Sequence, residues 1–132
     1  MPPPARANLS SLDEQGSEGL GLVEPKWTTR VGLLRIRSVN AAGHWTLELD
    51  GELDVSNAEA LDQEIRLAET SAETVTVDLR GLAFMDSSGL RALLQAQHRS
   101  RVDGRLRIRK GSRGVQSVFR LTRTEDALPF EA

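Results

Sequence analysis

The spacing of apolar residues changes several times along the chain, and this succession restricts the folds that it can form. Apolar and charged side chains alternate in residues 31–38 and 44–50, which is typical of strands with one buried face. Residues 40–43 are a turn signal between these runs, so together they predict a hairpin. Residues 56–70 change to helical spacing, and residues 74–79 form a β-branched run that predicts a buried strand.

The same two periods continue to the end of the chain. Asp86 and Ser112 are the expected N-caps of a second and a third helix, with a strand at residues 105–110 between them. The order is strand–strand–helix–strand–helix–strand–helix, with a short final strand at residues 127–131. Since strand–helix–strand units form right-handed crossovers between parallel strands, we expect an α/β fold. It consists of a mixed β-sheet of four to five strands with amphipathic helices packed on one face.

The first helix has two further features. Ser56 and Glu59 have the spacing of a capping box, in which side chains bind free amide groups at the helix start. Several acidic residues are predicted on the outer face of this helix. They form a stripe that we interpret as a solvated surface, with a docking site as the alternative: Glu59, Asp62, Glu64 and Glu69.

The two ends of the chain differ in character. Residues 1–28 hold four of the five prolines and lack periodicity, so we expect a flexible N-terminal extension, with the domain at residues 29–132. The first residues lack the apolar segment of a signal peptide, and no apolar run approaches the length of a membrane span. We therefore expect a cytoplasmic protein without a membrane span.

Composition excludes several kinds of site. The chain has no cysteine, which excludes disulfides, a thiol nucleophile and cysteine-ligated metals. Its two histidines are far apart in sequence, which disfavours a histidine metal site. The net charge is only −2, but acidic residues concentrate in residues 1–79 and basic ones in residues 80–124. From this asymmetry we expect two opposed surfaces of different charge.

Chemistry is concentrated in residues 82–90, where a strand ends near Leu79 and a short loop leads through Asp86 into an apolar helix. Ser87 and Ser88 therefore lie at a helix N-terminus, where free amide groups and the helix dipole favour an added anion. The alternative is a plain N-cap and tight turn. A hydrolase serine is disfavoured, because its elbow motif requires glycine where this chain has methionine.

Two motifs together carry a resemblance to a known family. Gly51-Glu-Leu-Asp54 is followed by a helix, by the strand at residues 75–79 and by Phe84-Met-Asp-Ser-Ser-Gly-Leu90. This arrangement resembles the STAS domain, and more narrowly the bacterial anti-sigma factor antagonists, over roughly residues 30–130. The N-terminal extension is not covered by the resemblance.

The resemblance implies a phosphorylation switch. In that family the serine directly after the motif aspartate is phosphorylated, and that position is Ser87 here, with Ser88 as the less favoured acceptor. The unphosphorylated form binds an anti-sigma factor and so releases the sigma factor, whereas the phosphorylated form does not bind. By the same carry-over Asp54 lies near the phosphorylation site, although it could instead cap the first helix.

The implied partners are an anti-sigma factor that is itself a serine kinase, and a serine phosphatase. ATP and Mg²⁺ belong to the kinase, so we expect no cofactor in this chain, which would be a monomer or weak dimer and not an enzyme. Arg91 replaces a small or apolar residue of the family and could tune partner choice. The expected partner-binding surface comprises Asp54, Asp86, Ser87, Ser88, Gly89, Leu90 and Arg91.

Three other functions were weighed. The first alternative is a soluble STAS subunit of a membrane lipid or solute transporter. The second is a nucleotide-binding or nucleotide-hydrolysing enzyme, for which the turn at residues 109–114 lacks phosphate-loop spacing. Direct nucleic-acid binding is disfavoured, because no aromatic residues interleave with the arginines of residues 105–110, which fit a solvated or partner-facing strand better.

Overall fold

Five strands form one mixed sheet, and they lie in the same order in space as along the chain. The computed structural model describes residues 26–131. The first three strands pair antiparallel, whereas the third pairs parallel with the fourth and the fourth with the fifth. The strands are β1 (Lys26–Val31), β2 (Leu34–Ala41), β3 (His44–Leu53), β4 (Thr74–Met85) and β5 (Leu106–Arg109).

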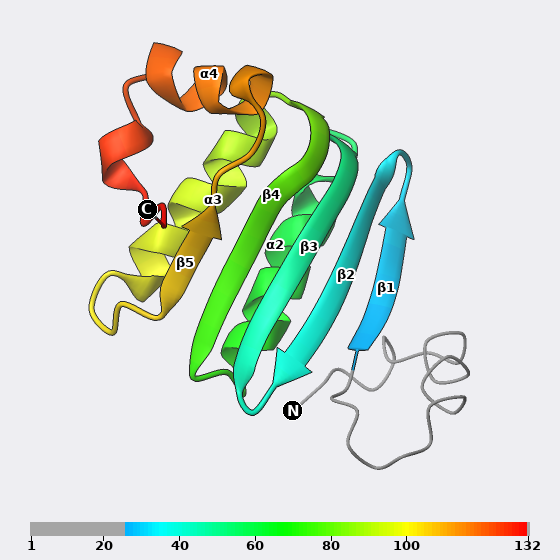
Figure 1. Cartoon of the computed structure of the whole chain (residues 1–132), viewed down its shortest axis with the longest axis vertical. Helices are drawn as coiled ribbons and strands as arrows, with labels where there is room; N and C mark the ends of the chain where they lie inside the picture. Colours follow the sequence, from blue (N-terminus) through cyan, green and yellow to red (C-terminus); the bar gives the residue numbers. More distant parts are fainter. Residues whose placement is uncertain (1–25, 132) are drawn as a thin grey trace.

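The helices provide the crossovers between the parallel strands. Figure 1 shows α2 and α3 behind the sheet and α4 at one end of β4 and β5, while the opposite face of β2 and β3 is open. The predicted α/β class, the mixed sheet and the alternation of strands with helices are confirmed. The helices are α2 (Ala58–Glu69), α3 (Ser87–Ser100) and α4 (Arg113–Leu121), followed by the short 3₁₀-helix η1 (Glu125–Ala127).

Alternating apolar residues place the core on the helix-covered face of the sheet. Every second side chain is buried through residues 34–38 of β2 and 45–49 of β3, as predicted, and the residues between them are charged except for Thr46. Arg35 pairs with Asp50 at 3.1 Å and Arg37 with Glu48 at 3.6 Å on the open face. The buried residues of these strands are Leu34, Ile36, Ser38, Trp45, Leu47, Leu49 and Leu53.

The predicted hairpin of β2 and β3 is confirmed. Ala41 pairs with His44, so the loop consists of Ala42 and Gly43. These two residues have φ angles of 55° and 90°, the positive values that a two-residue type I′ turn requires. Asn40 accepts a hydrogen bond from the Gly43 amide at 2.9 Å and so closes the turn.

The first strand corrects the predicted domain boundary. Lys26 to Thr28 were assigned to the extension, but they begin β1, and Val31 ends this strand instead of starting the next. The Trp27 ring is buried against Trp45, with ring centroids 4.9 Å apart. The sheet therefore reaches five strands through β1. The rest of the predicted flexible extension lies outside the described residues.

The ends of two other predicted strands also differ. The strand expected to end near Leu79 continues to Met85, so no loop separates it from Asp86. The final strand expected at residues 127–131 is wrong: within the described residues that segment makes one parallel bridge, between Phe130 and Ile108. The chain before this bridge is a 3₁₀-helix, which ends at Ala127.

One member of the expected acidic stripe is inside the molecule. The Glu64 side chain faces β1 and is only 2% exposed. Its carboxylate accepts hydrogen bonds from Trp27 Nε1 at 3.5 Å and from Thr29 Oγ1 at 3.4 Å. Glu64 therefore fastens β1 to α2 and is not part of a solvated face.

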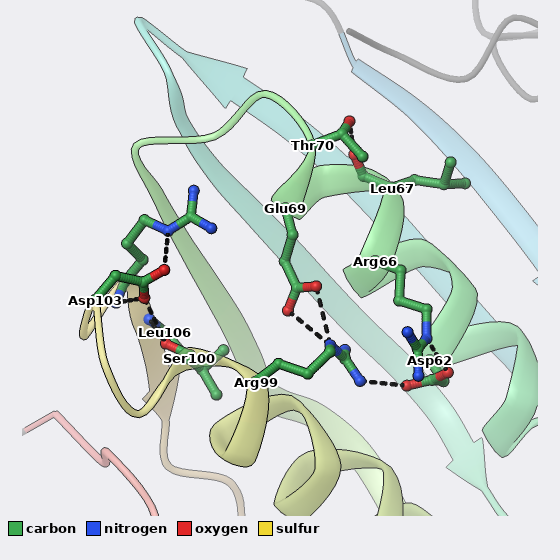
Figure 2. A network of polar contacts seen from close by, with 10 residues as sticks. Asp62, Arg66, Leu67, Glu69, Thr70, Arg99, Ser100, Asp103 and Leu106 are labelled. Atoms are coloured by element: carbon green, nitrogen blue, oxygen red, sulfur yellow. Dashed lines mark hydrogen bonds and ion pairs between the residues drawn. The ribbon is translucent and has the colours of Figure 1, made fainter.

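The acidic and basic parts of the sequence do not form opposed surfaces. Arg99 of α3 binds two carboxylates of α2, Asp62 at 3.2 Å and Glu69 at 3.0 Å, as Figure 2 shows. On the sheet, Arg109 lies 3.4 Å from Asp78. The two charge types are thus paired across elements, because the fold interleaves the two parts of the sequence. No helix in residues 26–131 is both long and apolar enough to cross a membrane.

Candidate functional site

Parallel pairing brings the two motifs together at one edge of the sheet. Leu53 of β3 pairs with Met85 of β4, and the Asp86 amide donates to the Leu53 carbonyl at 3.1 Å. Adjacent strands lie about 4.8 Å apart, so Asp54 and Asp86, the residues that follow these two strand ends, are neighbours. The two aspartates therefore follow neighbouring strand ends, where the chain enters α2 and α3.

Gly51 allows the first motif to fit against the neighbouring hairpin. It has a φ of +102°, and a Cβ atom on it would lie 1.9 Å from the Leu33 carbonyl oxygen. The next residue, Glu52, donates its amide to the same oxygen at 3.0 Å. Only glycine allows this backbone approach without a shift of the chain, which explains why the motif begins with this residue.

Asp54 organises the turn into α2. Its Oδ1 accepts hydrogen bonds from the Ser56 amide at 2.9 Å and the Ser56 hydroxyl at 2.6 Å. The expected capping box is therefore wrong, because the Ser56 hydroxyl is already bound and Asn57 occupies the N-cap without a side-chain cap bond. Asp54 therefore orders the turn before α2 but does not cap the helix, whose N-cap is Asn57.

Asn57 is a buried polar residue that the sequence analysis missed. Its Oδ1 accepts from the Asp54 amide at 2.9 Å, and its Nδ2 donates to the Glu52 carbonyl at 3.0 Å and the Val31 carbonyl at 3.3 Å. It thus joins the turn before α2 to β1 and β3. Burial with all of these partners is a property of the tertiary structure, so no local sequence signal indicated it.

The second motif begins α3 as predicted. Asp86 is the N-cap, and its Oδ1 accepts from the Ser88 amide at 2.8 Å. Ser87 is the first residue of the helix and is exposed, and Ser88 is half-buried. The Ser87 hydroxyl forms no hydrogen bond to any residue in 26–131. A free and accessible hydroxyl therefore stands at a helix N-terminus, directly after the aspartate that caps the helix.

Two residues of the expected partner surface are inside the molecule. Gly89 is buried, and a Cβ atom there would lie 2.6 Å from Leu53 Cδ2 and 2.7 Å from Met85 Cγ. Leu90 is only 6% exposed and belongs to the core. Gly89 and Leu90 are therefore corrected from partner contacts to packing residues, which let the first turn of α3 approach the ends of β3 and β4.

An open groove of about 590 Å³ runs between the N-terminal halves of α2 and α3. Ser87 lies on its wall, so the groove includes the candidate phosphorylation site. The contribution of α2 to this surface is not indicated by the sequence pattern, because the way two helices face each other depends on the whole sheet. The lining residues are Val55, Ala58, Glu59, Asp62, Ser87, Ser88, Arg91, Ala92 and Gln95.

Exposed apolar side chains lie at the same end of the sheet. Leu33 is 68% exposed, Val55 78% and Phe84 48%. They belong to neighbouring segments, since Glu52 binds the Leu33 carbonyl and pairs with Phe84 across the β3–β4 ladder. Exposed apolar residues grouped near one site are typical of a protein-binding surface. Leu33 stands next to the alternating run that begins at Leu34, and that signal could have identified it.

A family comparison identifies the fold. A family model described as "Mlab, STAS domain" matches residues 30–129. The chain belongs to the STAS domain family. No curated protein sequence matches it significantly.

Solved structures of the same fold include anti-sigma factor antagonists. An anti-sigma factor antagonist from Mycobacterium paratuberculosis is 20% identical, with a TM-score of 0.67 over 74% of this chain and 84% of that one. The anti-sigma factor antagonist SpoIIAA in its unphosphorylated form is 23% identical, with a TM-score of 0.58 over 81% and 88%. The Bacillus cell fate determinant SpoIIAA in the phosphorylated form is 22% identical, with a TM-score of 0.53 over 81% and 91%. These likenesses confirm the STAS fold of this chain.

Proposed function

We propose that this STAS domain is an anti-sigma factor antagonist regulated by phosphorylation of Ser87. Its unphosphorylated form binds an anti-sigma factor that is itself a serine kinase, and this binding releases the sigma factor. Phosphorylation blocks the binding, and a serine phosphatase restores it. The observation that carries the proposal is the exposed, unbonded hydroxyl of Ser87 at the start of α3, on the wall of the groove.

The position of Ser87 suits a phosphoryl acceptor. A kinase can reach its hydroxyl without unfolding the helix, and the ATP and Mg²⁺ of the reaction belong to the kinase. At the N-terminus of α3 the helix dipole favours the added negative charge by about 0.3–1 kcal/mol, so the fold tolerates the phosphate. Ser88 is the less suitable acceptor, because it is half-buried one residue further into the helix.

The surroundings of Ser87 allow a phosphate to act on binding through charge alone. The phosphate adds about 1.5–2 negative charges directly after Asp86 in the chain and on a groove that already contains Glu59 and Asp62. A partner that covers this surface would have to desolvate all of them, which costs several kcal/mol. Since about 1.4 kcal/mol is a tenfold change in affinity, such a cost is enough to separate the two proteins.

The known structures of the fold support the proposal. One of them is described as an anti-sigma factor antagonist in its unphosphorylated form, and the same protein was also solved in a phosphorylated form. The exposed apolar residues Leu33, Val55 and Phe84 add a contact surface of the kind that a protein partner buries.

The acceptor is tested by incubating the purified protein with candidate anti-sigma factor kinases and ATP and mapping the phosphopeptides by mass spectrometry. We expect one phosphate on Ser87, its loss in Ser87→Ala and its retention in Ser88→Ala. Labelling that persists in Ser87→Ala but disappears in Ser88→Ala would assign the site to Ser88 and overturn this part of the proposal.

The second candidate is a soluble STAS subunit of a membrane lipid or solute transporter. The exposed apolar residues beside the groove would serve a transporter component as well as an anti-sigma factor. Affinity purification of the tagged protein from its native cells separates the two. Recovery of a kinase supports the antagonist, whereas recovery of a permease and its ATPase supports the transporter subunit.

A further inference from the structure

Arg91 is a cation without a carboxylate partner in a groove that contains acidic residues. Its side chain is exposed and lines the groove together with Ser87. It forms no ion pair or hydrogen bond with residues 26–131. Asp62, which lines the same groove from α2, is already bound by Arg66 at 2.8 Å and by Arg99 at 3.2 Å. Arg91 is therefore free to bind an anion that arrives later.

Helix geometry directs Arg91 toward Ser87. The two residues are four positions apart in α3, so their Cβ atoms lie about 5–6 Å apart on one face of the helix. Side chains in a helix lean toward its N-terminus, which brings the guanidinium of Arg91 over the turn that contains Ser87. An acid followed four residues later by a base is also the favourable order for an ion pair within a helix.

We propose that Arg91 binds the phosphate of phosphorylated Ser87 and holds it against α3. The inference rests on the proposed function, since it requires phosphorylation of Ser87. The guanidinium donates two parallel hydrogen bonds to phosphate oxygens, a geometry that lysine cannot reproduce. Phosphorylation then changes the surface twice, because it adds negative charge and also removes Arg91 from the contacts that a partner could make.

Other charged groups near the phosphate also change its pKa. Asp86 caps the same helix, Asp54 follows the neighbouring strand, and Glu59 and Asp62 line the groove from α2. All four raise the pKa of the phosphate, whereas Arg91 lowers it. The contribution of Arg91 is therefore measured as a difference between two proteins that share these four carboxylates.

The test uses full-length protein with phosphoserine introduced at position 87 during synthesis, so that no kinase is required. A ³¹P NMR titration gives the second pKa of the phosphate in three proteins: the otherwise unchanged protein, Arg91→Gln and Arg101→Gln. Arg101 is an exposed arginine at the other end of α3, about 21 Å along the helix axis, so its replacement changes the net charge equally. At this distance, beyond the Debye length at physiological ionic strength, it has little effect on the phosphate.

We expect Arg91→Gln to raise the phosphate pKa by roughly half a pH unit and Arg101→Gln to leave it unchanged. The inference is overturned if Arg91→Gln has no effect, or if both substitutions raise the pKa equally, which would indicate only a change of net charge. The phosphate is introduced without a kinase, so this test does not depend on the kinase assay. If Arg91→Gln raises the phosphate pKa but the kinases leave Ser87 unphosphorylated, only the proposed function is contradicted.

Discussion

Gly89 determines how closely the first turn of α3 approaches the sheet. Replacement by alanine adds a methyl group within 2.8 Å of Leu53 and Met85 side-chain atoms. Alanine favours helices by about 1 kcal/mol over glycine, but overpacking of a filled core costs about 1–3 kcal/mol. We expect Gly89→Ala to lower the free energy of unfolding in urea by about 1–2 kcal/mol.

Gly114 provides the matched control for this substitution. It lies in the first turn of α4, where an added Cβ atom would meet only the Ser112 hydroxyl at 3.9 Å. Gly114→Ala should leave stability unchanged or increase it by up to about 1 kcal/mol. Equal effects of the two substitutions on the urea midpoint would show that packing at Gly89 is not tight.

Local sequence patterns predicted the roles of single residues correctly where those roles depend only on neighbours in the sequence. Asp86 and Ser112 were predicted as N-caps, and both accept a hydrogen bond from an amide of their own helix. Ser56 was also predicted to cap a helix, but its hydroxyl donates a hydrogen bond to Asp54 instead. Burial of Leu90 was missed, since the sequence pattern does not show how far α3 tilts into the sheet.

Among the elements, β4 carries a buried carboxylate on the side of the sheet away from the helices. Burial by itself raises the pKa of Asp78, but hydrogen bonds from the Arg80 side chain and amide, with the charges of Arg80 and Arg109, hold it below its ordinary value of 3.8. The carboxylate lies 2.9 Å from Arg80 Nη2 and 3.4 Å from Arg109 Nη1. Charged Asp78 is therefore favoured by the folded state.

The lowered pKa predicts a pH dependence of stability. Charged Asp78 adds to the free energy of unfolding at every pH above the pKa that its carboxyl has in the unfolded chain, about 4. This stabilisation is lost as the pH falls further, through the lower pKa of the folded protein. We expect Asp78→Asn to be less stable than wild type at pH 7, and the difference to shrink progressively below pH ~4. Urea unfolding at several pH values measures it.

Asp50→Asn is the control for the acid titration. Asp50 pairs with Arg35 on the same face of the sheet, but both side chains are about half exposed. An exposed pair of this kind contributes less than about 1 kcal/mol, so its loss should change stability little at any pH. A stability difference for Asp78→Asn that is constant between pH 7 and pH ~2 would contradict the account of Asp78.

Alternation and helical spacing predicted most elements, but they failed where a tertiary contact decides the outcome. The period-two pattern identified β2, β3 and β5 because each has one buried face. β1 was missed because its short sequence shows little apolar alternation, although its pairing partner β2 follows directly in the chain. Its side-chain bonds to Glu64, from Trp27 and Thr29, join residues 37 and 35 positions apart. The continuation of β4 past Arg80 was missed because pairing with β3 resumes after a register shift.

Across the whole molecule, Arg99 is the main polar link between the two helices that flank the groove. Its guanidinium binds Asp62 and Glu69 of α2 while its side chain is only 22% exposed (Figure 2). Replacement by glutamine leaves two partly buried carboxylates without this partner, which costs about 1–3 kcal/mol. We expect Arg99→Gln to lower the free energy of unfolding by this amount, measured in urea.

Arg101→Gln is the control for this substitution, since it removes the same charge from the exposed end of α3. Since the Arg101 guanidinium donates to the His98 carbonyl at 2.9 Å at the exposed helix end, its loss should cost less than about 1 kcal/mol and less than Arg99→Gln. Stability that falls equally in both variants would assign the effect of Arg99 to net charge and not to the link between the helices.

The charge distribution shows what a linear sequence cannot give at this scale. Acidic and basic residues are separated along the chain, yet Arg99 forms ion pairs with Asp62 and Glu69 of α2, and Arg109 forms one with Asp78. The two motifs were predicted together, because the resemblance to STAS domains joined them. Their position beside a groove depends on the parallel pairing of β3 with β4, which the sequence pattern indicated only as a crossover.

The central claim is that a negative charge on Ser87 separates this protein from its anti-sigma factor. Isothermal titration calorimetry of the cognate kinase with wild type, Ser87→Asp and Ser71→Asp measures it most directly. Ser71 is an exposed serine just beyond the far end of α2, about 18 Å along that helix, and controls for added charge. We predict an affinity loss of about 100-fold or more for Ser87→Asp and little change for Ser71→Asp. Binding of Ser87→Asp as tight as that of wild type would contradict the account.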